Sequence, residues 1–204
     1  MAKLAPTKGN FLAEKKRLWL ANTGYELLDR KRNILIREMM QMIDTASELH
    51  DRIEHTFGEA YAALQRANIT GGIREDLAMD VPLDDSLSIR YRSVMGVEIP
   101  IIECDTKPPE YPPYGMAESN SALDEAYLRF AEVKRLAAVM AEVENSVYRL
   151  ADAIKKTQKR AKALKNIIIP ETEASVREIS VVLEEKEREE FSRMKIIKKK
   201  KNGR

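Results

Sequence analysis

Residues 18–53, LWLANTGYELLDRKRNILIREMMQMIDTASELHDRI, contain two interleaved series of residues that each recur at intervals of seven. The first series is Leu18, Tyr25, Arg32, Met39, Ala46 and Ile53, and the second is Ala21, Leu28, Leu35, Met42 and Leu49. Mostly apolar positions repeated over several heptads are typical of a coiled-coil seam, which is narrower than the apolar face of a globular helix. The repeat extends back to Leu4 and on to Ala63, so it predicts one helix over about residues 8–67.

The sequence after residue 67 predicts an insertion. The segment NITGG at 68–72 combines turn chemistry with low helix propensity, so the helix should end there. Apolar residues then alternate with polar ones at 87–91 and at 97–101, with Gly96 between the runs, which predicts two short strands that could form a hairpin. The proline-rich segment 104–116, CDTKPPEYPPYGM, is expected to be extended or irregular.

A second amphipathic helix is predicted to begin at Ser119 or Ser121, where a serine cap precedes acidic residues. Its apolar residues recur at intervals of three and four through residue 194. Neither seam is satisfied alone, so the two helices should fold back on each other. The predicted fold is therefore all-α: a long antiparallel two-helix coiled coil, with helices in 1–67 and 119–204 and a β-hairpin or irregular insertion in 68–118.

The predicted seam residues are those apolar positions that both helices turn toward each other. They are Leu18, Tyr25, Leu28, Leu35, Met39, Met42, Leu49, Ile53, Met140, Val147, Ile154, Leu164, Ile168, Ile179 and Leu183. Methionines in such a seam are adaptable core filler more often than a binding surface.

Pro170 interrupts the second helix within the stretch NIIIPETEASV. A proline inside a helix loses one backbone hydrogen bond and clashes with the preceding turn, at a cost of about 3 kcal/mol. The seam continues on both sides of Pro170, so one helix with a local bend is expected, with the carbonyl of Asn166 left without its usual donor.

Composition and motifs point away from catalysis. The 35 basic and 33 acidic residues nearly balance, so no overall field favours nucleic acid. His50 and His55 lie outside any metal-binding motif, Cys104 is the single cysteine, and no phosphate-binding loop or carboxylate pair in a pKa-raising context is present. We therefore expect no catalytic residue, metal, cofactor or nucleic-acid partner. The N-terminus lacks the features of a signal peptide and no stretch is apolar enough to span a bilayer, so a cytoplasmic location without membrane insertion is expected.

Two terminal stretches carry patterns more specific than heptads. In residues 4–35 the pattern consists of Pro6, Thr7, Leu12, Arg17, Leu18, Ala21, Gly24, Leu27, Leu28, Lys31, Arg32 and Leu35. In residues 160–200 it consists of Arg160, Ala163, Leu164, Ile169, Pro170, Ile179, Leu183, Glu185, Glu187, Arg188, Glu189, Arg193 and Lys195. Both stretches resemble the D subunit of the rotary V-type and A-type ATPases. Asn33, Lys162 and Lys165 depart from the usual residues, and VMGVEIP at 94–100 is similar to the family's hairpin motif.

The resemblance implies a central rotor shaft without a nucleotide site. Such a shaft stands inside a ring of catalytic A and regulatory B subunits, binds the F subunit of the central stalk, and joins a funnel-shaped subunit seated on the membrane rotor ring. It would transmit torque between ATP hydrolysis or synthesis and ion transport.

The resemblance also suggests two contact regions. Charged residues near the C-terminus would make weak, changing contacts in the bore of the ring: Arg193, Lys195, Lys198, Lys199, Lys200 and Lys201. The hairpin would touch the base of the ring or the F subunit through Val94, Met95, Gly96, Val97 and Ile99, although a purely structural hairpin would carry the same sequence.

Two other functions fit the coiled coil without the resemblance. A self-contained adaptor or tether would share the heptads, and a nucleic-acid-binding coiled coil could use the basic residues of 155–165 and the tail. The acidic run EEKEREE at 184–190 beside the tail would repel phosphates and weakens the second alternative.

Overall fold

The structure is a computed structural model and describes residues 5–73, 77, 81, 86–104, 112–115 and 119–202. The elements are α1 (Lys8–Gly71), β1 (Leu87–Val94), β2 (Val97–Cys104), α3 (Ser121–Ala163), the π-helical turn η1 (Leu164–Ile168) and α4 (Ile169–Asn202). The chain forms two compact units: unit 1 is Met1–Asn33 with Lys155–Arg204, and unit 2 is Ile34–Ile154. Both α1 and α3 contribute to each unit.

The prediction of two long helices with a small antiparallel hairpin between them is confirmed. The first helix begins as expected, since the Thr7 hydroxyl caps it by accepting a hydrogen bond from the N–H of Asn10 at 3.3 Å. It ends later than predicted, at Gly71, because Gly72 adopts φ 75° and its N–H donates to the carbonyl of Asn68. This left-handed glycine is the usual means of closing a helix C-terminus.

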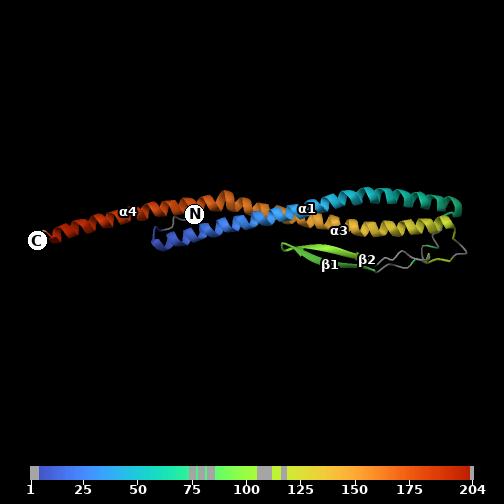
Figure 1. Cartoon of the computed structure of the whole chain (residues 1–204), viewed down its shortest axis with the longest axis horizontal. Coiled ribbons are helices and arrows are strands. Elements are labelled where there is room, and N and C mark those ends of the chain that lie inside the picture. The colour runs from blue at the N-terminus through green and yellow to red at the C-terminus, as the bar shows by residue number, and fades with distance from the viewer. Residues whose placement is uncertain are drawn as a thin grey trace. The chain divides into compact units, whose positions relative to one another are not determined.

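The second helix begins at Ser121 and is capped by Asn120. The Asn120 side-chain oxygen accepts a hydrogen bond from the N–H of Leu123 at 2.8 Å, and its amide nitrogen donates to the Thr70 hydroxyl at 2.8 Å. The expectation of a serine cap is therefore wrong: Asn120 caps the helix, and Ser121 is its first residue. Because Asn120 bonds both its own helix and the last turn of α1, the two helix ends meet at the same end of unit 2 (Figure 1).

Unit 2 is an antiparallel pair of helices with the hairpin packed against it. One core cluster joins Leu35 and Leu150, which are fully buried, to Ile99 of β2, and a second joins Leu49, Leu136 and Val143. Burying one leucine contributes about 1.5–3 kcal/mol, so these clusters hold the helices together. The ion pair between Arg129 and Glu59, at 2.8 Å, and the edge-on contact between Tyr61 and Phe130 continue the pairing toward the helix ends.

The hairpin has an unbroken register from Val94↔Val97 at the turn to Leu87↔Cys104 at the open end. Met95 and Gly96 form the turn, with φ values of 51° and 76°. Two positive φ values define the type I′ turn that matches the twist of the strands. Asn or Gly is favoured at its first position, so Met95 holds a backbone conformation that costs on the order of 1 kcal/mol.

Unit 1 pairs the start of α1 with the end of α3, η1 and α4. Ala21, Ala161 and Ile179 are buried there, and a Cβ on Gly24 would meet Leu164 at 3.8 Å. The ion pair between Lys8 and Glu187 at 2.9 Å shows that the start of α1 lies beside the later part of α4, so the helices run antiparallel. Small residues at this seam let the helices approach closely with little apolar bulk between them.

A π-helical turn precedes Pro170. The N–H of Ile169 donates to the carbonyl of Leu164, five residues earlier, and α4 then continues through Pro170. The expectation of one helix on both sides of the proline is met, since α3, η1 and α4 follow one another without a break. The proline is thus accommodated by one wider turn, in which the hydrogen-bond pattern shifts just before the residue that lacks a donor.

Candidate functional site

None of the predicted seam residues is exposed. Leu35, Leu49 and Ile179 are buried and every other predicted seam residue is half-buried. Leu4, which began the heptad series, lies outside the described residues, as does most of the proline-rich segment. Side chains that pack between the helices are not accessible to a partner. We therefore look for contact surfaces for other subunits or proteins among the exposed residues.

The seam also contains polar positions that the heptad pattern did not reveal. Glu14, Ser146, Thr157 and Thr172 are buried, although a heptad argument considers only apolar residues. Glu14 is reached by Arg17 at 3.5 Å, and the Thr172 hydroxyl donates to the carbonyl of Ile168 at 2.7 Å, at the end of the π-helical turn. Three of the four lie in unit 1, where the seam is therefore more polar than in unit 2.

The hairpin lies against the helices of unit 2 through one face. Ile99 is buried in the core cluster with Leu35 and Leu150, and Val94 and Val97 pack against the same cluster. Met95 and Gly96 at the turn are exposed. Of the predicted hairpin contacts, only this turn pair is thus open to a partner.

The free edge of β2 is bonded to α3. The N–H of Ile102 donates to the Glu142 carboxylate at 2.7 Å, and the Arg149 guanidinium donates to the carbonyl of Glu98 at 3.2 Å. Between them stands Pro100, which is buried and has no N–H to satisfy. An edge strand normally leaves a row of unpaired backbone groups, and here α3 binds two groups of that row.

Further contacts hold β1 to both helices. Arg92 donates to Glu38 of α1 at 2.8 Å, and the Arg149 guanidinium lies 5.5 Å from the centre of the Tyr91 ring. The hairpin is therefore anchored to α1 and α3 by apolar packing and by charge-assisted hydrogen bonds. None of these partners could be identified from the spacing of the sequence.

Tyr114 is a further buried residue that the sequence did not single out. Its hydroxyl donates to Asp124 of α3 at 2.9 Å, and its ring meets Tyr127 edge-on. Burial, followed by this hydrogen bond, raises the pKa of the Tyr114 hydroxyl above the ordinary value of 10.0. The contact fastens one point of the proline-rich segment to the start of α3.

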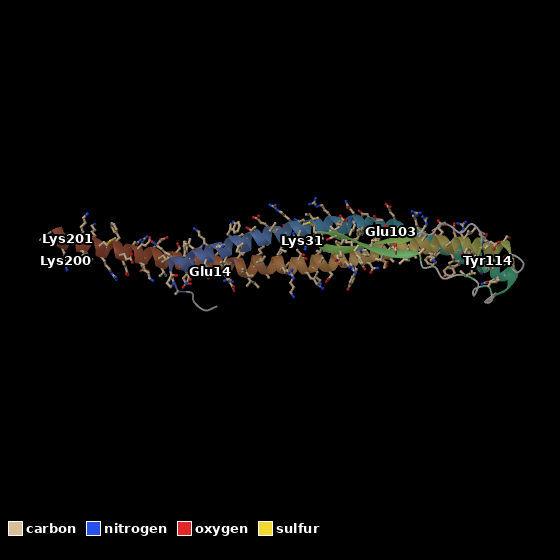
Figure 2. All side chains as sticks on the ribbon, turned by 90° about the horizontal axis from the view of Figure 1, so that it is seen from below. Glu14, Lys31, Glu103, Tyr114, Lys200 and Lys201 are labelled. Carbon is tan, nitrogen blue, oxygen red and sulfur yellow. The ribbon has the colours of Figure 1, made fainter. Side chains whose placement is uncertain are left out.

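The C-terminal part of α4 is exposed along its whole described length. Every residue from 184 to 201 is exposed, including the predicted ring contacts Arg193, Lys195 and Lys198–Lys201. Figure 2 shows Lys200 and Lys201 at the end of α4, beyond the part of unit 1 that carries Glu14. Lys8 bonds Glu187, and this hydrogen bond and the charge of the carboxylate raise the pKa of the lysine. The pair lies at the start of α1, so the residues of α4 beyond Glu187 extend past that helix.

Unit 1 also exposes large apolar side chains. Those on α1 are Leu12, Trp19, Leu20 and Leu27, and those near the end of α4 are Phe191, Met194, Ile196 and Ile197. Heptad spacing relates Leu12 to Trp19 and Leu20 to Leu27, so the sequence did contain a signal for a second apolar face of α1. These apolar side chains lie outside the helix pairing of unit 1.

The described residues offer no arrangement suited to metal chemistry or to a membrane span. Within them, His, Cys, Asp and Glu residues form no group of three that could hold a metal ion. Their helices likewise contain no apolar run of the length and purity that would cross a bilayer.

The chain is similar to known proteins over nearly its whole length. The family model for the D subunit of ATP synthase matches residues 10–199. A relative named as the D subunit of a V-type ATP synthase, from Thermotoga neapolitana, is 45% identical over 199 residues, covering 97% of this chain and 98% of the relative. A relative named as the D subunit of an A-type ATP synthase, from Pyrococcus furiosus, is 37% identical over 200 residues, covering 96% of this chain and 94% of the relative.

Proposed function

The chain belongs to the family of ATP synthase D subunits, and from this premise we propose how its surfaces serve a rotary ATPase. It is a central rotor-shaft subunit, which carries torque between nucleotide chemistry and ion transport and is not itself catalytic. The observation that supports this most strongly is the match of both the long helices and the insertion to relatives of the same length. This assignment takes the place of the adaptor and nucleic-acid-binding alternatives.

The proposed partners are other subunits of the same machine. Unit 1 would stand inside the ring of A and B subunits, and other parts of the chain would bind the F subunit and the funnel-shaped subunit above the membrane rotor. The complex would be membrane-associated, with this chain on its cytoplasmic side.

The exposed C-terminal part of α4 is proposed as the contact with the ring bore. It combines the cations Arg193, Lys195 and Lys198–Lys201 with scattered apolar side chains. Long, exposed cationic side chains form weak ion pairs, each worth about 0–1 kcal/mol, that exchange easily. Such contacts suit a shaft that must leave one subunit face for the next without a deep energy well.

Removal of the tail tests this contact. An ATPase assembled with the chain cut after Glu190 should keep its subunit composition but lose coupling between ATP turnover and ion transport. The control is a matched pair in the full chain: Lys198–Lys201 all changed to Arg should keep the coupling ratio, and the same four changed to Gln should lower it. Unchanged coupling in the truncated complex would count against the bearing role.

The hairpin turn is proposed as a second contact, with the ring base or the F subunit. Met95 holds a backbone conformation that favours Asn or Gly, and its side chain is 44% exposed, so a large apolar group is presented at the tip at a conformational cost. Met95→Asn should raise the stability of the isolated chain by about 0.5–1 kcal/mol and lower ATPase activity in the complex. Met95→Leu is the control that keeps an apolar tip, and equal activity of both variants would show that the tip makes no functional contact.

A further inference from the structure

Among the described residues, the outer edge of β1 presents backbone groups without a partner in a regular row. In a hairpin with a two-residue turn the flanking pair, here Val94 and Val97, is hydrogen-bonded, and bonded and non-bonded pairs then alternate. The N–H and C=O groups of Ile89, Tyr91 and Ser93 therefore point away from β2. Their partners on β2 confirm this alternation. Ile102, opposite Ile89, and Glu98, opposite Ser93, direct backbone groups away from β1, to Glu142 and Arg149.

The side chains of β1 alternate in chemistry as well as in direction. Leu87, Ile89 and Tyr91 share one face of the strand and are 49%, 53% and 57% exposed. Arg90 and Arg92 lie on the other face, where Arg90 pairs with Glu103 at 3.1 Å and Arg92 with Glu38 at 2.8 Å, and 72% and 46% of their side chains are exposed. A strand added at this edge would thus meet an apolar row on one side and, on the other, two arginines that have N–H donors left beyond their ion pairs with Glu103 and Glu38.

The edge is also held in a fixed geometry. Ile99, Glu142 and Arg149 secure β2 to the helices, and Arg92 and Tyr91 secure β1 itself. Because the hairpin is already ordered, a strand that pairs here would lose no conformational entropy of β1 or β2, which favours binding. Over its eight residues β1 contains no proline and pairs with β2 without a bulge, so it lacks two common devices that prevent edge-to-edge association.

We propose that the edge of β1 binds an extended strand from a neighbouring protein of the ATPase complex, in which apolar residues alternate with acidic ones. Backbone hydrogen bonds to Ile89 and Tyr91 would supply affinity. Acids opposite Arg90 and Arg92 would accept from the guanidinium N–H groups that Glu103 and Glu38 do not occupy, and would set the register. A second copy of this chain fits the edge less well, because pairing β1 with itself would bring its arginine rows together. This inference rests on the proposed function, since it draws its partner from the same complex.

Hydrogen exchange tests the proposal at the level of single amides. Exchange is measured by mass spectrometry with fragmentation, once on the isolated full chain and once on the purified ATPase that contains it. The amides of Ile89 and Tyr91 should exchange at least ~10-fold more slowly in the ATPase, whereas those of Arg90 and Arg92, already bonded to β2, should be protected in both samples. Equal exchange of Ile89 and Tyr91 in the two samples would overturn the proposal.

Two variants separate strand pairing from general burial. Ile89→Pro removes one outward N–H without costing a bond to β2, as Pro100 does naturally on the opposite strand. Ile89→Pro should leave the melting temperature of the isolated chain within a few degrees of the wild type. In the ATPase it should abolish the slow exchange of the Tyr91 amide, whereas Ile89→Val should retain it. Protection that survives Ile89→Pro would overturn strand pairing.

The remaining outcomes are distinguishable. A concentration-dependent dimer of the isolated chain with protected β1 amides would overturn the choice of occupant in favour of a second copy. A purified ATPase that lacks this chain would overturn the proposed function and this inference together. A chain present with unprotected β1 amides overturns this inference alone.

Discussion

Ser146 of α3 is fully buried, and its hydroxyl oxygen has no hydrogen-bond partner in the described part of the chain. An unsatisfied buried hydroxyl costs about 1–3 kcal/mol, so Ser146→Ala should stabilise the chain by roughly 1 kcal/mol, measured by urea unfolding. Ser47→Ala, at an exposed position of α1, is the control for the higher helix propensity of alanine. A loss of stability in Ser146→Ala would mean that the hydroxyl has a partner.

Tyr114 makes a pH-dependent contribution because its pKa is raised in the folded chain. Below about pH 10 the phenol is protonated in both states and the contribution is complete. Above that pH the unfolded chain loses the proton first, so stability falls until the folded pKa is reached. Tyr114→Phe removes the bond to Asp124 and should cost about 1 kcal/mol at pH 8.

The control for this prediction is the difference in melting temperature between the wild type and Tyr114→Phe, followed as the pH rises. The advantage of the wild type over Tyr114→Phe should shrink between about pH 9 and pH 11, since only the wild type can lose this proton. An advantage that stayed constant over that range would show that the Tyr114 hydroxyl is not held protonated by the fold.

The π-helical turn and Pro170 form one element, and its cost can be measured. Pro170→Ala restores an N–H, but the downstream register is held by buried Thr172 and Ile179. The expected gain in stability is therefore about 1 kcal/mol, below the roughly 3 kcal/mol of a proline that the helix had not accommodated. We propose that the local bend expected at Pro170 serves rotation, so the variant should also assemble normally and couple less well.

A neighbouring substitution is the control for this element. Glu171→Ala changes an exposed residue of the same turn and leaves Pro170 in place. Both stability and coupling should stay near those of the wild type. A lower melting temperature in Pro170→Ala would show that the proline stabilises the π-helical turn.

The free chain should have a wide range of local stabilities. In unit 1 every described residue of α4 after Glu187 is exposed, and a helix of this length without tertiary contacts is marginal in water. In unit 2 the cluster of Leu49, Leu136 and Val143 pins both helices. Amides of 188–201 should therefore exchange at least ~100-fold faster than those of this cluster, and should slow on assembly into the ATPase if the tail enters the ring.

The pattern of side chains by itself determined the helices, the hairpin and the family. Heptads at Leu35 and Leu49 and alternation at 87–91 and 97–101 are local periodicities, which depend only on the geometry of one helix or one strand. Continuity of the seam past Pro170 was readable for the same reason. The terminal motifs then identified the family over positions that the comparisons match.

Only the tertiary structure decided which side chains remain for partners. The bonds of Ile102 to Glu142 and of Arg92 to Glu38 join residues 40 and 54 positions apart, so no spacing predicts them. They turn one face of the hairpin into core and leave Met95 and the edge of β1 exposed. The π-helical turn was not predictable either. A proline in the sequence shows which backbone N–H is missing, but not which kind of helical turn accommodates the loss.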